Sequence, residues 1–309
     1  MAGVWRKTVR LRPAFGAESR RGYEMRKRKI WTPGRGHLYL LIPPGVFIAL
    51  LFVWPLATVV YQALFDPSFG LGNFATILGS TTHIRVLLFT FELAGEVTLI
   101  CLLVAYPVAY LVSRARDSML HIALALILIP FWTSVVIRTY AWAALFQRYG
   151  LVNDLLLELG IVDEPVKFIY NDVGVLIGMV QILLPFMILP LLNTMRRMDA
   201  TLIRAAEILG ANPLRVFLHV YLPLSMPGVT AGVLLVFISA VGFYVTPAVL
   251  GGPRQMMVAV LIEQYVTRTL NWPLASALAT ILLAITTVLY LVYERVTRRV
   301  GGAFNMGRG

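Results

Sequence analysis

Six apolar stretches, each long enough to cross a membrane, limit most of what this chain can fold into. They cover residues 37–64, 86–112, 119–145, 173–193, 223–250 and 273–293. A helix needs about 20 mostly apolar residues to cross the hydrocarbon layer. Only 14% of the residues are charged, against about 25% in soluble domains. The sequence therefore predicts an all-α integral membrane protein with six transmembrane helices.

Lysine and arginine in the connections indicate how these spans are oriented. They gather in residues 1–37, in the connections after the second and fourth stretches, and after the sixth. Because cytoplasmic loops collect Lys and Arg, we predict cytoplasmic N- and C-termini. The predicted parts are a basic, disordered tail over 1–37, a six-helix domain over 38–296 and a C-terminal tail over 297–309. Most of the net charge of +12 lies in these cytoplasmic segments, which favours membrane lipid over nucleic acid as a partner.

A polar, amphipathic segment over residues 199–223 lies on the predicted cytoplasmic side. Asp199 is placed to cap a first short helix, and Gly210 ends that helix. Asn212 and Pro213 have the order of an N-cap and a first helical residue, so a second helix is expected to begin there. Spacings of three and four place four apolar residues on one face of the first helix: Leu202, Ala205, Ala206 and Leu209.

This segment resembles the EAA loop of permease subunits in binding-protein-dependent ABC importers. That pattern is Glu-Ala-Ala, three residues, Gly, nine residues, Ile, one residue, Leu-Pro. The residues that match it in register are Ala205, Ala206, Gly210, Leu222 and Pro223. Val220 replaces Ile, and Arg204 stands where the pattern has Glu. The alternative is a solvated connector that contains Ala-Ala-Gly by chance.

The resemblance implies the fold and the coupling role of a type I ABC importer permease. In such proteins the loop docks as a coupling helix into a cleft of a separate ATPase. The residues that this implies for ATPase contact are Leu202, Arg204, Ala205, Ala206, Leu209, Gly210, Asn212 and Pro213. The Arg204 departure puts one polar contact in question rather than the docking itself.

The sequence lacks the common motifs of energy conversion and hydrolysis. No lysine follows a glycine, so the chain has no phosphate-binding loop for ATP. Its four histidines are far apart and its one cysteine, Cys101, lies in an apolar run. We therefore predict no catalytic residue, no metal site and no cofactor in this chain. Energy would come from a partner ATPase that holds ATP and Mg, or, as an alternative, from an ion gradient.

Two glutamates stand out within the second apolar stretch. Glu92 and Glu96 are four residues apart, so both project from one face of the helix. Charged groups at membrane depth are costly and usually face a cavity or a partner. They are candidate contacts for a cationic solute. The alternative is that both lie at the outer headgroup level or pair with Arg138, and this reading is favoured for Glu92.

Aromatic residues concentrate in two further segments. Residues 130–142 contain Trp132, Arg138 and Tyr140, and residues 242–253 contain Tyr244. An aromatic belt with a snorkelling arginine is the common meaning of such composition. Both segments also resemble parts of spermidine/putrescine-type permeases. Ring faces can hold ammonium groups, which adds Trp132, Arg138, Tyr140 and Tyr244 to the candidate solute path.

A short apolar segment over 255–267 is too short to cross the membrane. It is predicted to form an outer helix that lies on the membrane, and Glu263 is its candidate contact for the solute path or a gate. An ordinary interfacial helix is the alternative.

The family resemblance implies a complete import system in the bacterial inner membrane. Its expected partners are a second permease subunit, two copies of an ATP-binding ATPase subunit, and an extracytoplasmic solute-binding protein. The expected solute is a polyamine. An amino acid, an opine, a phosphonate or ferric ion is the alternative within the class, and a secondary transporter is the alternative outside it.

Overall fold

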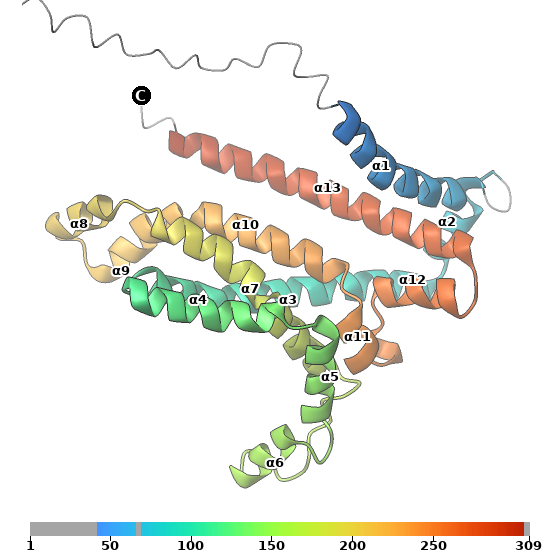
Figure 1. The fold of residues 1–309 in the computed structure, drawn as a ribbon, viewed down its shortest axis with the longest axis horizontal. Helices are drawn as coiled ribbons and strands as arrows, with labels where there is room; N and C mark the ends of the chain where they lie inside the picture. The colour runs from blue at the N-terminus through green and yellow to red at the C-terminus, as the bar shows by residue number, and fades with distance from the viewer. Residues whose placement is uncertain (1–41, 66–68, 306–309) are drawn as a thin grey trace, which may run out of the picture. The chain divides into compact units, whose positions relative to one another are not determined.

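The computed structural model describes residues 42–65 and 69–305, and within these ranges it is almost entirely helical (Figure 1). The predicted tail over 1–37 lies outside the described residues. The helices are α1 Ile42–Phe65, α2 Gly72–Gly79, α3 Thr81–Ser113, α4 Asp117–Trp132, α5 Val135–Leu145, α6 Leu151–Glu158, α7 Asp172–Arg196, α8 Ala200–Ile208, α9 Pro213–Val216, α10 Leu222–Val241, α11 Val245–Leu250, α12 Val258–Thr267 and α13 Trp272–Asn305. The predicted all-α membrane fold is confirmed.

Residues 56–309 form one compact unit, and the described part of residues 1–55 is the first half of α1. Within the larger unit, α3, α7 and α10 pack against one another along their length. Their shared core is fully buried and contains Val97, Cys101, Met187 and Val236. Five helices are individually long and apolar enough to span a membrane, and α4 with α5 forms a sixth candidate span.

Two glycines on α10 allow this helix to approach α7 closely. A Cβ atom at Gly228 would lie 2.8 Å from the Thr194 side chain and 2.9 Å from the Pro190 carbonyl oxygen. A Cβ atom at Gly232 would lie 2.6 Å from the sulfur of Met187. Small residues at such crossings are typical of helices that associate in lipid, where packing contacts replace the hydrophobic effect.

The third predicted span, 119–145, is not one straight helix. The axes of α4 and α5 differ in direction by 92° across a break at Thr133 and Ser134. Pro130 cannot donate a backbone hydrogen bond, and the Thr133 hydroxyl donates to the Pro130 carbonyl at 2.6 Å. This contact closes the end of α4, and the chain turns before α5 begins. The third predicted span is therefore present as a bent pair of helices.

The fifth predicted span, 223–250, is also different in the structure. The spanning helix begins earlier, at Pro213, and ends at Val241. After a turn through Gly242, the separate short helix α11 follows. The second helix of the polar segment therefore continues through a π-helical turn, Phe217–Tyr221, directly into α10.

The last two helices agree more closely with the helices predicted from the sequence. The short outer helix expected within 255–267 is present as α12. The sixth span is present as α13, but this helix is longer than predicted and continues to Asn305.

The close α7–α10 crossing gives a direct test. We expect Gly228→Ala to lower the free energy of unfolding by about 1–3 kcal/mol, because the added methyl group overpacks the contact with Thr194 and Pro190. The melting temperature of the purified chain in detergent measures this. The matched control is Gly95→Ala on α3, where a Cβ atom meets nothing within 4 Å. Equal melting temperatures for the two variants would contradict the close-packing explanation.

Candidate functional site

The polar segment 199–223 folds as its cap residues predict. The Asp199 carboxylate accepts a hydrogen bond from the Thr201 backbone N–H at 2.9 Å, which holds the pKa of Asp199 below its usual value. Gly210 has φ +81°, a conformation that favours glycine. The Asn212 side chain accepts from the Arg215 N–H at 2.8 Å, and Pro213 is the first residue of α9. Both predicted caps and the predicted break are confirmed.

This segment lies at one end of the α3–α7–α10 bundle, and α5, α6, α11 and α12 lie toward the other end (Figure 1). The inward side of α8 contains Ile203, which packs against the bundle core. Ala206 is half-buried, and Leu202, Ala205 and Arg204 are exposed. The four predicted face residues therefore do not all share one environment.

Large apolar side chains are exposed where α8 ends. Ile208 is 85% exposed and Leu209 is 86% exposed. Leu214 and Leu218, on the following turn and helix, are also exposed. We define Ile208, Leu209, Leu214 and Leu218 as the α8 apolar surface. Ile208 and Leu214 were not among the predicted contact residues, although both are apolar residues beside Gly210 and Pro213.

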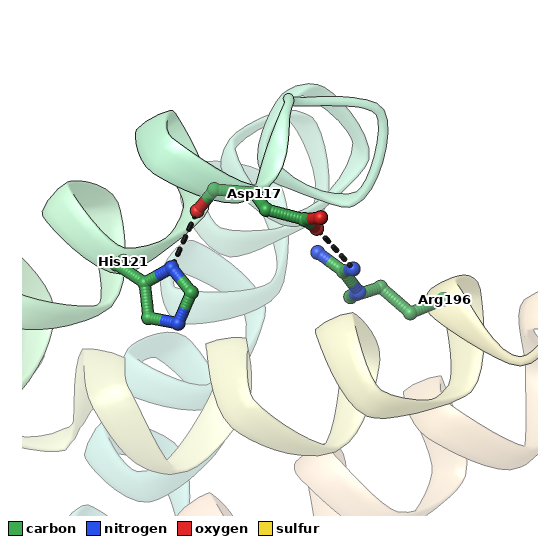
Figure 2. Close-up of polar contacts among 3 residues, drawn as sticks. All are labelled: Asp117, His121 and Arg196. Atoms are coloured by element: carbon green, nitrogen blue, oxygen red, sulfur yellow. Dashed lines mark hydrogen bonds and ion pairs between the residues drawn. The ribbon is translucent and has the colours of Figure 1, made fainter.

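An ion pair joins the first residue of α4 to the last residue of α7 (Figure 2). An Arg196 guanidinium nitrogen lies 3.5 Å from an Asp117 carboxylate oxygen. The His121 ring nitrogen Nδ1 donates to the Asp117 backbone carbonyl. Because the Asp117 side chain is 87% exposed, water screens the pair and its contribution to stability is small.

The opposite end of the bundle contains a cleft of about 900 Å³. Its charged lining has both signs, with Arg85 and Glu92 from α3, Asp172 from the start of α7, and Arg254. Gln255 donates to the Asp172 carboxylate at 2.9 Å and accepts from the Gly252 N–H at 3.2 Å. The cleft thus brings Glu92 together with a second carboxylate that is distant in sequence.

A strained loop forms the wall of this cleft beside Asp172. Tyr170 has φ +59°, which is uncommon for a residue with a side chain. Its backbone N–H donates to the Leu250 carbonyl at 2.8 Å. A Cβ atom at Gly252 would lie 3.2 Å from the Tyr170 Cβ. The loop before α7 is therefore held against the turn after α11.

The other predicted path residues do not gather at this cleft. Glu96 is exposed on α3, one helical turn beyond Glu92 and outside the cleft lining. Trp132, Tyr140 and Tyr244 are exposed at the surface around the α4–α5 break and before α11. Glu263 is half-buried on α12, where its carboxylate accepts from the Thr267 hydroxyl at 2.8 Å.

Arg138 lies half-buried on α5. Its Nε and Nη1 atoms are buried without a hydrogen-bond partner among residues 42–65 and 69–305. Within the same residues no ion pair joins Arg138 to Glu92 or Glu96. The structure therefore does not place Arg138 with the two glutamates.

Sequence reasoning missed Asp172, Arg254 and Gln255 as members of the cleft. In the sequence, Asp172 directly precedes the fourth apolar stretch and belongs to no motif. Its place opposite Glu92 depends on how α3 and α7 pack, and no motif joins positions so far apart in the chain. In the described part of the chain, no three His, Cys, Asp or Glu side chains form a group that would hold a metal ion.

The excursion between α5 and α7 is organised around one buried side chain. Asn153, on α6, donates to the carbonyls of Gln147 and Val166, each at 3.0 Å, and accepts from the Val166 N–H at 2.8 Å. Phe146 stacks on Phe168 at the base of the excursion, with ring centroids 5.1 Å apart. These contacts fix the loop that leads to Tyr170 and the cleft.

Comparison with known proteins finds a protein family that matches most of this chain. Residues 39–302 match the family described as the binding-protein-dependent transport system inner membrane component. The spermidine/putrescine transport system permease protein PotB of Haemophilus influenzae is 32% identical over 269 residues, which are 84% of this chain and 89% of that protein. PotB of Escherichia coli K12 is 34% identical over 230 residues, which are 74% of this chain and 83% of that protein.

A solved structure has the same fold at low identity. The chain resembles one chain of a bacterial alginate ABC transporter, with a TM-score of 0.71 and 18% identity. The likeness covers 85% of this chain and 94% of the other.

The role of Asn153 can be measured directly. We expect Asn153→Ala to destabilise the excursion by about 1–3 kcal/mol, because the buried Asn153 side chain makes three hydrogen bonds to the backbone of Gln147 and Val166 that the variant loses. Amide hydrogen exchange over residues 151–166 should become faster, while exchange within α7 stays unchanged. Asn193→Ala, at an exposed position on α7, is the control. Unchanged exchange in the Asn153 variant would show that the excursion is held by its aromatic contacts instead.

Proposed function

The chain belongs to the family of binding-protein-dependent transport system inner membrane components, and on that premise we propose that it passes a polyamine, such as spermidine or putrescine, across the bacterial inner membrane. The observation that carries the solute assignment is the 32% identity to a spermidine/putrescine permease over 84% of this chain. Family membership excludes the alternative that the sequence left open, a secondary transporter driven by an ion gradient.

Two carboxylates in the cleft suit a cationic solute. Glu92 and Asp172 line the same space, and the aromatic residues Phe89 and Tyr170 line it too. Carboxylates and aromatic rings together can hold an ammonium group on a flexible chain. Arg85 and Arg254 line the cleft too, so a polycation would be held weakly. Weak holding suits a transport path, because a solute that binds too tightly does not leave.

Glu96 extends this path by one helical turn along α3. Its exposure and its spacing from Glu92 make it the next carboxylate for an ammonium group that leaves the cleft. Trp132, Arg138, Tyr140, Tyr244 and Glu263 remain candidates for later positions, including those formed with a second permease subunit.

The α8 apolar surface is the proposed contact with the ATPase. Burying an exposed Leu or Ile side chain contributes about 1.5–3 kcal/mol, so Ile208 and Leu209 supply a strong apolar anchor. Leu202, Arg204, Ala205 and Ala206 belong to the same loop, while Gly210, Asn212 and Pro213 set its shape. This end of the bundle is the proposed cytoplasmic end.

The proposed assembly contains this chain, a second permease subunit, two ATPase copies and an extracytoplasmic solute-binding protein. ATP and Mg would bind to the ATPase subunits, because the sequence has no phosphate-binding loop. ATP can drive transport only if the ATPase prefers one of two permease conformations. The α8 apolar surface at one end and the cleft at the other are the two sites that such a change would link.

The coupling proposal predicts the effect of a charge on the α8 apolar surface. We expect Leu209→Asp to weaken retention of the ATPase subunit by at least about tenfold, because an apolar contact is replaced by a desolvated carboxylate. Copurification of the assembled complex measures retention, and solute uptake should fall with it. The control is Leu159→Asp, a leucine after α6 that is 69% exposed, toward the opposite end of the bundle. Normal uptake by Leu209→Asp would refute the coupling role.

The solute proposal is tested by ATP hydrolysis of the complex in lipid with its binding protein. Spermidine and putrescine should stimulate hydrolysis, whereas an amino acid and a phosphonate should not. Glu92→Gln should raise the spermidine concentration for half-maximal stimulation about fivefold, the effect of about 1 kcal/mol from one carboxylate. Glu158→Gln, on α6 outside the cleft, is the control. Stimulation by the phosphonate instead of the polyamines would rule out the solute assignment and leave the family assignment intact.

A further inference from the structure

A recess of about 350 Å³ lies between the ends of the spanning helices and α8. Its lining includes the last residues of α3, the last residues of α7, the inward side of α8 and one tyrosine. The polar and charged members are Ser113, Arg114, Arg196, Arg204, Glu207 and Tyr221. We call this space the arginine recess.

The arginine recess has an excess of positive charge. Three of its residues are arginines, and Glu207 is its one acidic residue. Arg196 reaches the exposed carboxylate of Asp117 at 3.5 Å, outside the lining. In the part of the chain that the structure describes, neither Arg114 nor Arg204 has a carboxylate partner. The carbonyl ends of α3 and α7 offset about half a charge each, so about one positive charge remains on the lining residues themselves, beside the exposed Asp117 carboxylate.

Aromatic rings hold one of these arginines in place. The Arg114 guanidinium carbon lies 4.3 Å from the centroid of the Tyr110 ring and 5.6 Å from that of Tyr221. The Tyr221 hydroxyl is within 3.2 Å of the Ser113 hydroxyl. A guanidinium stacked on a ring still presents its N–H donors at its edge. Arg114 is therefore ordered and keeps donors for an anion.

The position of the recess favours a lipid headgroup as the anion that binds there. Ser113 and Arg196 are the final positions of two candidate spanning helices, and this place at the end of the spans suits a ligand from the lipid headgroup layer. Leu111, one turn before Arg114 on α3, is 68% exposed, and it offers apolar surface beside the recess for an acyl chain. Basic pockets between spanning helices bind phosphate headgroups in this way.

We propose that the arginine recess binds the phosphate of an anionic lipid headgroup, with Arg114 and Arg204 as its main donors. The bound lipid would lie beneath α8 and contact both the bundle and the α8–α9 loop. Arg204 belongs to the loop proposed to contact the ATPase, and in this proposal its guanidinium binds the lipid phosphate while the α8 apolar surface makes the ATPase contact. The proposal concerns lipid binding alone and does not depend on which solute is transported.

The test is lipid retention by the full chain, purified from nanodiscs of phosphatidylcholine with and without phosphatidylglycerol. Native mass spectrometry counts the phosphatidylglycerol molecules that remain bound. Each of Arg204→Gln and Arg114→Gln should weaken retention about fivefold, the effect of about 1 kcal/mol per basic residue near a membrane surface. Arg204→Lys should retain most of the binding. The control is Arg215→Gln, an exposed arginine on α9 outside the recess.

Three outcomes would overturn the proposal. Equal retention by Arg204→Gln and Arg215→Gln would show that the recess is not the lipid site. Displacement of the lipid by glycerol phosphate at equal concentration would assign the recess to a free phosphate. Loss of ATPase binding by Arg204→Gln, with lipid retention unchanged, would assign Arg204 to the ATPase. Arg204 is exposed, so its variant keeps the test valid even if Arg114→Gln does not fold.

Discussion

The close crossing of α7 and α10 is the contact on which the rest of the structure depends. In lipid the backbone must satisfy its hydrogen bonds within helices, and helices then associate through close packing more than through exclusion of water. Gly228 and Gly232 bring α10 against α7 at distances that a Cβ atom would not allow. Because α3 packs on both helices, this crossing also fixes the position of α3 beside them. The functional ends of the bundle are placed by these three helices.

The two ends of the bundle have opposite kinds of surface. At the α8 end, the loop exposes large apolar side chains above a recess lined by arginines. At the other end, a cleft combines two carboxylates with two arginines. A single chain with this arrangement can contact a protein at one end and a charged solute at the other. The helices α3 and α7 contribute residues to both ends.

Proline, threonine and glycine residues at the breaks in the spans explain where the fold departs from regular helices. Pro130 and Thr133 end α4, and the chain then turns by 92° into α5. Gly242 similarly separates α10 from α11. Irregular backbone at membrane depth is tolerated where protein covers it, and the Thr139 and Thr246 hydroxyls, which are 3.2 Å apart, join the two segments after the breaks. The breaks therefore position α5 and α11 beside one another.

The sequence by itself determined the all-α membrane class, the caps at Asp199 and Asn212, and the family, because apolar length, local hydrogen-bonding chemistry and a motif in register all depend on neighbours in the chain. It also marked Glu92 as an unusual residue. Only the tertiary structure decided that Asp172 joins Glu92 in the cleft, that Trp132 and Tyr244 lie apart from it, and that Arg114 and Arg204 line one recess. These relations depend on how α3 packs against α7 and on where α8 lies at the end of the bundle, and no local pattern in a sequence encodes the distance between residues that far apart.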